Sequence, residues 1–200
     1  MPLLFIKDID TDTRLGLWKI ADELHADEVC PQTVCEDLKQ KCGRRQQETV
    51  AVYALLNAMI GRKGVVIDHN ETGKPMLDDC FISVSHTVGY ACVMLSKTKN
   101  VAVDIEYRNN RVFRIVDKFL TKHEKEAIDC TSQTELLLCW CAKETTYKYF
   151  SEQKLVFKEI QIELKAVENE GFLYCLNQRE GTKKTIRYMQ NDDFVLTYTL

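Results

Sequence analysis

The sequence predicts a mixed fold of helices and strands, α/β or α+β, arranged as one compact domain or two small half-domains. The 200 residues and their 45% hydrophobic content are enough to bury a sizeable core. Stretches with the alternation of strands follow stretches with the spacing of helices. The chain has no low-complexity segment and no Pro/Gly-rich linker, so a division into halves would fall in a short connection.

The elements before residue 61 are predicted to be one strand and two helices. The apolar run Leu3–Lys7 predicts a strand, and a helix is expected around Asp12–His25. A second helix is predicted over Arg45–Ile60, because apolar residues recur there at helical spacing. Gly61 is expected to end this helix.

Three strands are predicted in the middle of the chain. They cover Cys80–Ser85, Tyr90–Leu95 and Val101–Glu106, after a turn at residues 69–75. Because short connections separate them, we expect the three strands to form a meander.

Two helices in the second half begin with capping-box patterns. Thr121 is followed by Glu124, and Ser132 by Glu135, so that a hydroxyl and a carboxylate can satisfy backbone N–H groups at each helix start. The second of these helices is predicted to cover Gln133–Phe150.

Two last strands are predicted near Phe157–Leu164 and Phe194–Thr199, where the residues alternate in the β manner. The second half therefore repeats the element order of the first, a long helix followed by strands, without a repeat at the level of residues.

Composition narrows the class of protein. A net charge of −3 argues against a dedicated nucleic-acid binder. We expect neither a signal peptide nor a membrane span, because charged residues follow the apolar start at once. The nine cysteines are an odd number and include apolar contexts, which favours a reducing cytoplasm. Zinc is not expected, because Cys30, Cys35 and Cys42, or Cys139 and Cys141, lack a paired Cys-x-x-Cys spacing.

Two carboxylates stand two residues apart in the strand "VAVDIE". Alternate side chains of a strand share a face, so Asp104 and Glu106 should point the same way and Val103 and Ile105 the other way. Carboxylates this close repel each other, and burying either one is costly, so the pair needs water or a shared cation.

A third carboxylate lies in the helical stretch "WCAKETTYK". Along steps of four, the row Leu136, Trp140, Glu144, Lys148 changes from apolar to charged halfway along the helix. Taken alone, Glu144 and Lys148 are most simply an exposed i, i+4 pair worth about 0.3 to 0.5 kcal/mol.

Together, Asp104, Glu106 and Glu144 would form an all-oxygen site suited to Mg²⁺, or to Mn²⁺. Lys143 and Lys148 would supply positive charge to a polyphosphate. This combination of a metal, lysines and one carboxylate that takes a proton is typical of phosphoryl transfer.

Two weaker motifs precede the carboxylates. "SVSHT" places Ser85 and His86 inside an apolar strand region, where a histidine is more often a hydrogen-bonded structural residue than a ligand contact. "GKP" contains Lys74 and Pro75 and by itself predicts only a turn.

In order and spacing, "GKP", "SVSHT", "VAVDIE" and "WCAKETTYK" resemble the four signature motifs of the 4′-phosphopantetheinyl transferases of the larger, two-half, surfactin-synthetase-activating type. The resemblance extends from about Arg45 to Lys148. Each motif alone is weak, and the set is specific.

The resemblance implies an α+β fold made of a pseudo-twofold pair of similar halves, with residues 1–100 on the nucleotide side of coenzyme A and residues 101–200 carrying the metal and transfer motifs. It implies a cytoplasmic, Mg²⁺-dependent enzyme of the holo-[acyl-carrier-protein] synthase type. Such an enzyme moves phosphopantetheine from coenzyme A to a serine of an apo acyl or peptidyl carrier protein and releases adenosine 3′,5′-bisphosphate. We expect a monomer that binds neither nucleic acid nor membrane.

The same resemblance implies roles for individual residues. Asp104, Glu106 and Glu144 resemble the metal ligands, and Glu144 is also the candidate proton acceptor. Lys148 resembles the lysine on the diphosphate, and Lys143 its companion. The nucleotide contacts are the adenine-side residues Lys74 and Pro75, the pair Ser85 and His86 near the 3′-phosphate and sugar, and the early arginine Arg45, for which Arg44 is an alternative.

Two positions depart from the family pattern. Ala102 stands where the family usually has glycine, and Cys141 replaces a small hydroxyl residue, but neither change removes a charged group.

Two other functions stay open. The chain could instead be a catalytically inactive homologue that binds coenzyme A or another nucleotide. It could also be a structural protein in which the "WCAKETTYK" helix is an ordinary amphipathic surface element.

Overall fold

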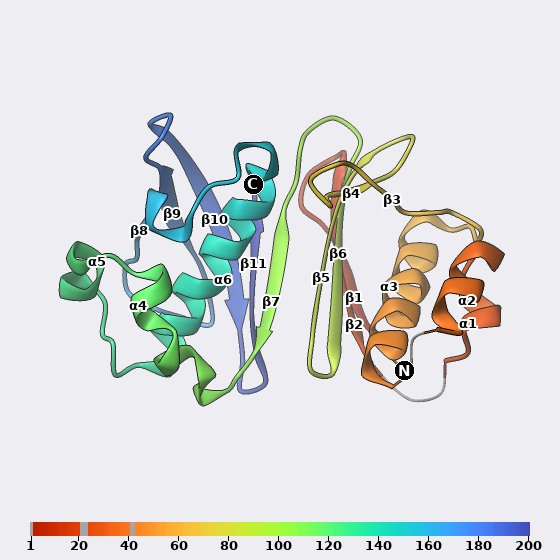
Figure 1. The fold of residues 1–200 in the computed structure, drawn as a ribbon, viewed down its shortest axis with the longest axis horizontal. Coiled ribbons are helices and arrows are strands. Elements are labelled where there is room, and N and C mark those ends of the chain that lie inside the picture. Colours follow the sequence, from red (N-terminus) through yellow and green to blue (C-terminus); the bar gives the residue numbers. More distant parts are fainter. Residues whose placement is uncertain (1, 21–23, 41–42) are drawn as a thin grey trace. The chain divides into compact units, whose positions relative to one another are not determined.

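The computed structural model describes residues 2–20, 24–40 and 43–200. The chain divides into two compact units, Met1–Asn100 and Val101–Leu200, here called unit 1 and unit 2. Each unit combines one long helix with its own antiparallel sheet (Figure 1). This mixture confirms the predicted α+β class.

Unit 1 contains a four-stranded sheet in the order β1-β2-β6-β5. Every neighbouring pair is antiparallel. The predicted first strand and the first two strands of the middle region are confirmed. The bounds are β1 (Leu3–Asp8), β2 (Thr13–Lys19), β5 (Phe81–Thr87) and β6 (Tyr90–Ser96).

The predicted helix over Asp12–His25 is wrong. Residues Thr13–Lys19 form β2, which pairs with β1 on one side and β6 on the other, and residues 21–23 lie outside the described part of the chain. Gly16 explains why a helix can pack closely over this strand. A Cβ added there would lie 2.7 Å from the sulfur of Met59 and 2.8 Å from a methyl carbon of Leu55.

The helix that packs on β2 is α3 (Arg44–Ile60), and it confirms the predicted helix within one residue. Its C-cap is Gly61 with φ 76°, a left-handed conformation that favours glycine. Val52, Leu55 and Leu56 lie in the apolar core between α3 and the sheet. Two short helices and a two-stranded ribbon complete unit 1, namely α1 (Ala26–Val29), α2 (Gln32–Leu38), β3 (Asp68–His69) and β4 (Pro75–Met76).

Unit 2 contains a five-stranded antiparallel sheet in the order β7-β11-β10-β9-β8. The predicted meander of three strands is wrong, because β7 pairs with β11 from the end of the chain and belongs to a different sheet from β5 and β6. Strands β9 and β10 form a hairpin that sequence reasoning missed. The bounds are β7 (Val103–Tyr107), β8 (Ile160–Glu163), β9 (Glu170–Asn177), β10 (Thr182–Gln190) and β11 (Phe194–Thr199).

The long helix of unit 2 is α6 (Gln133–Tyr149), one residue shorter than predicted. Ser132 caps it by accepting from the N–H of Glu135, but the Glu135 carboxylate accepts from Asp129 N–H and so does not complete a capping box. The capping box of Thr121 and Glu124 is present. The remaining helical turns are η1 (Asn110–Arg114), α4 (Val116–Phe119), α5 (Lys122–Ala127), η2 (Ser151–Gln153) and η3 (Phe157–Glu159).

The two units share one connection pattern. In each, the strand before the long helix pairs with the last strand of the unit, and that last strand forms a hairpin with its predecessor. The order is β2-β6-β5 in unit 1 and β7-β11-β10 in unit 2. Unit 1 extends this shared arrangement with β1, and unit 2 extends it with β9 and β8.

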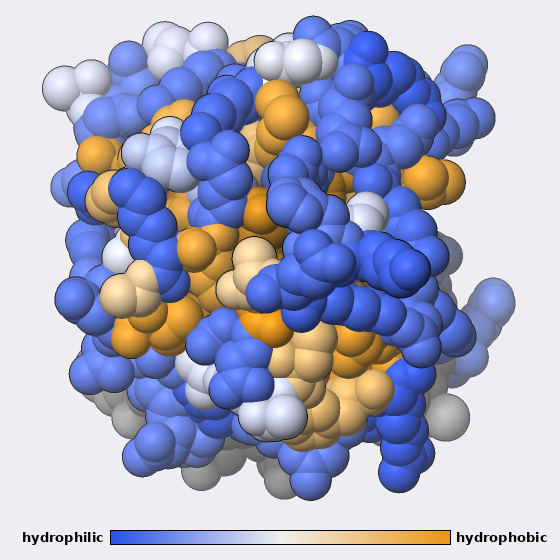
Figure 2. Space-filling view, turned by 90° about the vertical axis from the view of Figure 1, so that its left-hand side faces the viewer, coloured by the Kyte–Doolittle hydropathy of each residue, from blue (hydrophilic) through white to orange (hydrophobic). Residues whose placement is uncertain are grey.

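Part of the surface of the described chain is apolar. Figure 2 shows apolar side chains gathered in patches that charged and polar side chains surround. In unit 2 the exposed apolar side chains include Val156, Phe172 and Phe113. Among the described residues, the helices are too short or too polar to cross a membrane.

Candidate functional site

Asp104 and Glu106 lie on the face of β7 that α6 covers. Lys148 Nζ donates to Asp104 Oδ1 at 2.8 Å and to the Val103 carbonyl at 3.1 Å. Trp140 Nε1 donates to Glu106 Oε1 at 2.8 Å. Both carboxylates therefore meet the same helix, as the alternation of the strand predicted.

Glu144 lies on α6 one turn after Trp140 and one turn before Lys148. The side chains of this row, which are four residues apart, therefore face β7. Burial is the main cause that raises the pKa of Glu144 to about 7, and the negative charges of Asp104 and Glu106 add to it, while Lys148 opposes them. Burial and then the Asp104 charge also raise the pKa of Glu106. An exposed Glu144–Lys148 pair does not describe this cluster, because the site is half-buried and the charges of the carboxylates raise the pKa values of Glu106 and Glu144.

The donor chemistry of this cluster fits a hard divalent cation. All three side chains offer carboxylate oxygens, and their mutual repulsion is the kind that a cation relieves. Within residues 2–20, 24–40 and 43–200, no three acidic, histidine or cysteine side chains converge on one point as metal ligands. In this arrangement Asp104 is paired with Lys148, and Glu106 with Trp140.

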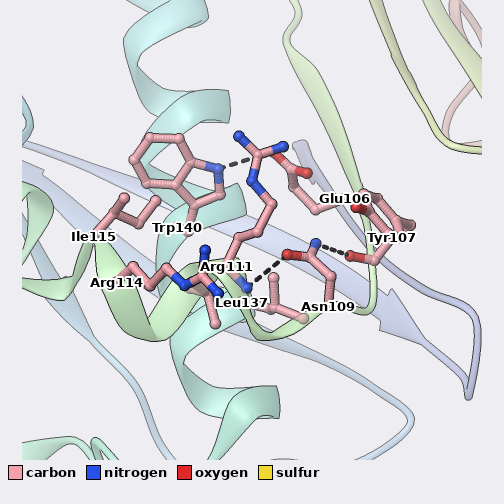
Figure 3. Close-up of a pocket in the computed structure, with 9 residues that line it drawn as sticks. Glu106, Tyr107, Asn109, Arg111, Arg114, Ile115, Leu137 and Trp140 are labelled. Carbon is pink, nitrogen blue, oxygen red and sulfur yellow. Dashed lines mark hydrogen bonds between the residues drawn. The ribbon is translucent and has the colours of Figure 1, made fainter.

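A cavity of about 350 Å³ adjoins Glu106 in unit 2. Figure 3 shows the guanidinium of Arg111 beside Glu106, near the N–H edge of the Trp140 indole. Asn109 fixes the start of this segment, because its side chain accepts from Arg111 N–H and donates to the Tyr107 carbonyl. The Arg111 charge lowers the pKa of Glu106, although burial outweighs it.

The structure corrects the placement of Lys143. Its side chain is 0% exposed, whereas that of Lys148 is 29% exposed. Lys143 Nζ donates to the carbonyls of Phe119 and Phe157 and pairs with the Glu124 carboxylate at 2.8 Å. A buried ammonium with these three partners faces the interior of unit 2 and not a polyphosphate.

The two positions that depart from the family pattern are accommodated in the interior. Ala102 donates its N–H to Thr199 Oγ1 at 3.0 Å and accepts from Thr199 N–H at 3.0 Å. Cys141 Sγ accepts from Thr197 Oγ1 at 3.3 Å. Both residues are fully buried.

In unit 1, Ser85 and His86 point to opposite faces of β5 because they are consecutive residues of a strand. Ser85 is buried. His86 faces α3, where its Nδ1 lies 3.3 Å from Glu48 Oε2. The other oxygen of Glu48 accepts from Arg44 Nε at 2.6 Å. Arg45, the arginine favoured by the sequence, is exposed and is adjacent to the one that shares this carboxylate.

Lys74 and Pro75 belong to a well-defined turn. Asn70 Oδ1 accepts from the N–H groups of Thr72 and Lys74, and Gly73 has φ 81°. Pro75 begins β4 and pairs with His69, while Lys74 Nζ donates to Asn100 Oδ1 at 2.6 Å.

Sequence reasoning missed three residues that the structure adds to these groups. In the sequence, Trp140 stands out only as a member of the helix row, and nothing there indicates its hydrogen bond to Glu106. Arg111 and Glu48 are not among the residues that the motifs point to. A basic residue soon after the carboxylate strand, and an acid four residues after Arg44, were the available indications.

The fold is of the α+β class, and its second unit places three carboxylates and a lysine together on one strand and one helix. The family model described as "4′-phosphopantetheinyl transferase superfamily" matches residues 100–199. The chain therefore belongs to the 4′-phosphopantetheinyl transferase superfamily. Members of this family are transferases of phosphopantetheine, with coenzyme A as substrate and carrier proteins as partners in general. A search of curated proteins returns no match.

Proposed function

We propose that this protein transfers the 4′-phosphopantetheine group of coenzyme A to a serine of an apo acyl or peptidyl carrier protein, in the manner of the larger, two-half type of the family. The serine oxygen forms a bond to the phosphorus that carries pantetheine, and the bond from that phosphorus to the bridging diphosphate oxygen breaks. The leaving group is adenosine 3′,5′-bisphosphate, and the serine proton passes to a base on the enzyme.

The observation that carries the proposal is the cluster formed by β7 and α6 inside the region matched by the family model. Asp104 and Lys148 are 44 residues apart in the chain, yet their side chains are in contact. Glu106 and Glu144 join them on the same strand and helix. Carboxylates with a half-buried lysine are the groups that phosphoryl transfer needs. The connection pattern shared by units 1 and 2 supports the two-half type.

Each side chain of the cluster has a proposed role. Glu144 accepts the serine proton, because it is the carboxylate on the helix that also carries Lys148. Lys148 stabilises the negative charge that develops on the departing bisphosphate. When bound, Mg²⁺, or Mn²⁺, would neutralise diphosphate oxygens, and Asp104, Glu106 and Glu144 are the residues that would hold it.

Unit 1 supplies the proposed contacts to the nucleotide end of coenzyme A. His86 and one arginine at the start of α3, Arg45 or its neighbour Arg44, are the proposed contacts to the 3′-phosphate. Lys74 and Pro75 form the adenine-side turn, which the Asn70 hydrogen bonds hold in one shape. Ser85 is proposed for the adjoining sugar.

Mass spectrometry of an apo carrier protein tests the reaction. After incubation with this protein, coenzyme A and Mg²⁺, we expect a mass gain of one phosphopantetheine on the carrier serine. Lys148→Ala should lower the rate at saturating coenzyme A by about 10²-fold to 10³-fold, as expected when one donor to a developing charge is lost. Asp104→Ala should abolish transfer without unfolding the chain.

A carrier of unchanged mass would contradict the proposal. If coenzyme A then still raised the melting temperature of the protein, the chain would be an inactive coenzyme A-binding homologue, because a ligand of the native state stabilises it. An exposed lysine such as Lys7 offers a control, since Lys7→Ala should transfer at the wild-type rate.

A further inference from the structure

Unit 1 contains a buried carboxylate whose two basic partners face solvent. The side chain of Glu48 is 7% exposed, whereas those of Arg44 and His86 are 59% and 47% exposed. Arg44 Nε lies 2.6 Å from Glu48 Oε1, and His86 Nδ1 lies 3.3 Å from Glu48 Oε2. One carboxylate thus holds a base from the first turn of α3 and a base from β5.

The width of this carboxylate sets the separation of the two bases. Because each oxygen takes a different partner, neither Arg44 nor His86 can turn away without leaving a buried negative charge with one partner fewer, and that loss is costly. The two basic side chains are therefore held as a pair, as two donors must be when they bind one small anion.

We propose that Glu48 is a positioning residue that presents Arg44 and His86 together to the 3′-phosphate of coenzyme A. This inference rests on the proposed function, and it assigns the early arginine of the phosphate site to Arg44 instead of Arg45. Glu48 itself does not touch the ligand; it acts through the two bases.

The orientation of the His86 ring follows from this geometry. Its Nδ1 lies on the Glu48 side, so the other ring nitrogen, Nε2, is the one that the ring can turn toward a phosphate. Without the Glu48 carboxylate, the ring would lose the partner that sets this orientation.

Binding of coenzyme A and 3′-dephospho-coenzyme A, measured by calorimetry on the full chain, tests the inference. The wild-type protein should prefer coenzyme A, and Glu48→Gln should reduce this preference by about tenfold, the loss expected when one charge-assisted contact is weakened. In transfer assays the variant should raise KM for coenzyme A more than it lowers kcat. A merely structural glutamate would weaken both ligands equally.

Thr49→Ala is the matched control, because Thr49 is the next residue of α3 and its hydroxyl donates only to the Arg45 carbonyl among the contacts resolved for it. Its preference for coenzyme A should equal that of the wild-type protein. Arg44→Ala should reduce the preference, and Arg45→Ala should leave it nearly unchanged. The opposite order for the two arginines would overturn the assignment.

A second measurement covers a Glu48 variant that fails to fold. Arg44→Ala and His86→Ala should each reduce the preference, and the double variant should lose less than the product of the two, since the bases act as a pair. Independent effects would overturn the inference. If the wild-type protein transfers phosphopantetheine and Glu48→Gln keeps the full preference for coenzyme A, only the positioning role of Glu48 is refuted. If the wild-type protein does not transfer phosphopantetheine, the proposed function is refuted. The binding preference for coenzyme A over 3′-dephospho-coenzyme A then still tests the role of Glu48.

Discussion

Unit 1 and unit 2 each bury one glutamate beside basic side chains, and the two arrangements differ in where the bases point. Glu48 in unit 1 holds Arg44 and His86, which are about half exposed. Glu124 in unit 2 holds Lys143, whose side chain is 0% exposed. Glu124 also accepts from the N–H groups of Thr121 and Ile162.

The difference shows that a buried glutamate can hold its basic partners either in the interior or at the surface of the protein. The Lys143 ammonium donates hydrogen bonds to Glu124 and to two backbone carbonyls. This ion pair therefore joins α5, α6 and the segment before β8. Arg44 and His86 keep a solvent-facing side, so their carboxylate can prepare them for a ligand. The same chemistry therefore joins elements in the interior of unit 2, and in unit 1 it is proposed to serve recognition.

The largest expected effect is on the structural pair. Lys143→Met should lower the free energy of unfolding by about 3 to 5 kcal/mol, because it leaves the Glu124 charge buried without its cation. Urea denaturation measures the change. The double variant Lys143→Met/Glu124→Gln should lose less than the sum of the two single losses.

Lys125 provides the exposed control for that pair. It bonds to Asp117, whose side chain is 90% exposed, so Lys125→Met should change the free energy of unfolding by less than about 1 kcal/mol. Equal losses for Lys143→Met and Lys125→Met would remove the distinction drawn between buried and exposed partners.

The second prediction compares how the two long helices meet their sheets. In unit 1, α3 approaches β2 closely over Gly16, whereas in unit 2, α6 meets β11 through the hydroxyls of Thr145 and Thr197, 2.6 Å apart. Gly16→Ala should destabilise the protein by about 1 to 3 kcal/mol through overpacking against Met59 and Leu55. Thermal or urea unfolding measures it. The same change made in a Met59→Ala background should cost less, and an equal cost in both backgrounds would show that contact with Met59 is not the cause.

The third prediction concerns the stability of the binding pair. Glu48→Gln should lower the free energy of unfolding by only about 1 kcal/mol, because exposed partners can regain water when the charge is lost. The same urea experiment compares it with Glu124→Gln, which leaves Lys143 buried and charged. A Glu48→Gln loss as large as that of Glu124→Gln would place Glu48 among the structural groups.

The smallest effect is expected at a surface pair of unit 1. Lys99, as the main cause, and the N–H of Asp12 lower the pKa of Asp10 from 3.8 to about 2. Because the folded-state pKa is depressed, the stabilisation is present above the unfolded pKa and is lost as the pH falls through about 2. The difference in urea midpoint between the wild-type protein and Asp10→Asn should therefore be present at neutral pH and shrink as the pH falls from about 4 to 2. A difference that does not change over this range would assign it to another cause.

The sequence by itself determined the elements whose information is local. The helix that ends at Gly61, the cap of Ser132 and the box of Thr121 with Glu124 follow from residues within a few positions of each other. Placement of Asp104 and Glu106 on one face follows from the period of a strand. The order and spacing of the motifs were enough to suggest the family that the match to residues 100–199 supports.

Only the tertiary structure decided which strands pair and which charged groups reach solvent. Residues Thr13–Lys19 form a strand because β1 and β6 pair with both of its edges, and β7 leaves the expected meander because β11, almost a hundred residues later, takes its edge. Lys143 and Lys148 lie five residues apart on one helix, yet one is buried against Glu124 and the other meets Asp104. The role of each lysine depends on the side of α6 that it faces and on the long-range partner that it meets there. The spacing of residues in the sequence indicates neither.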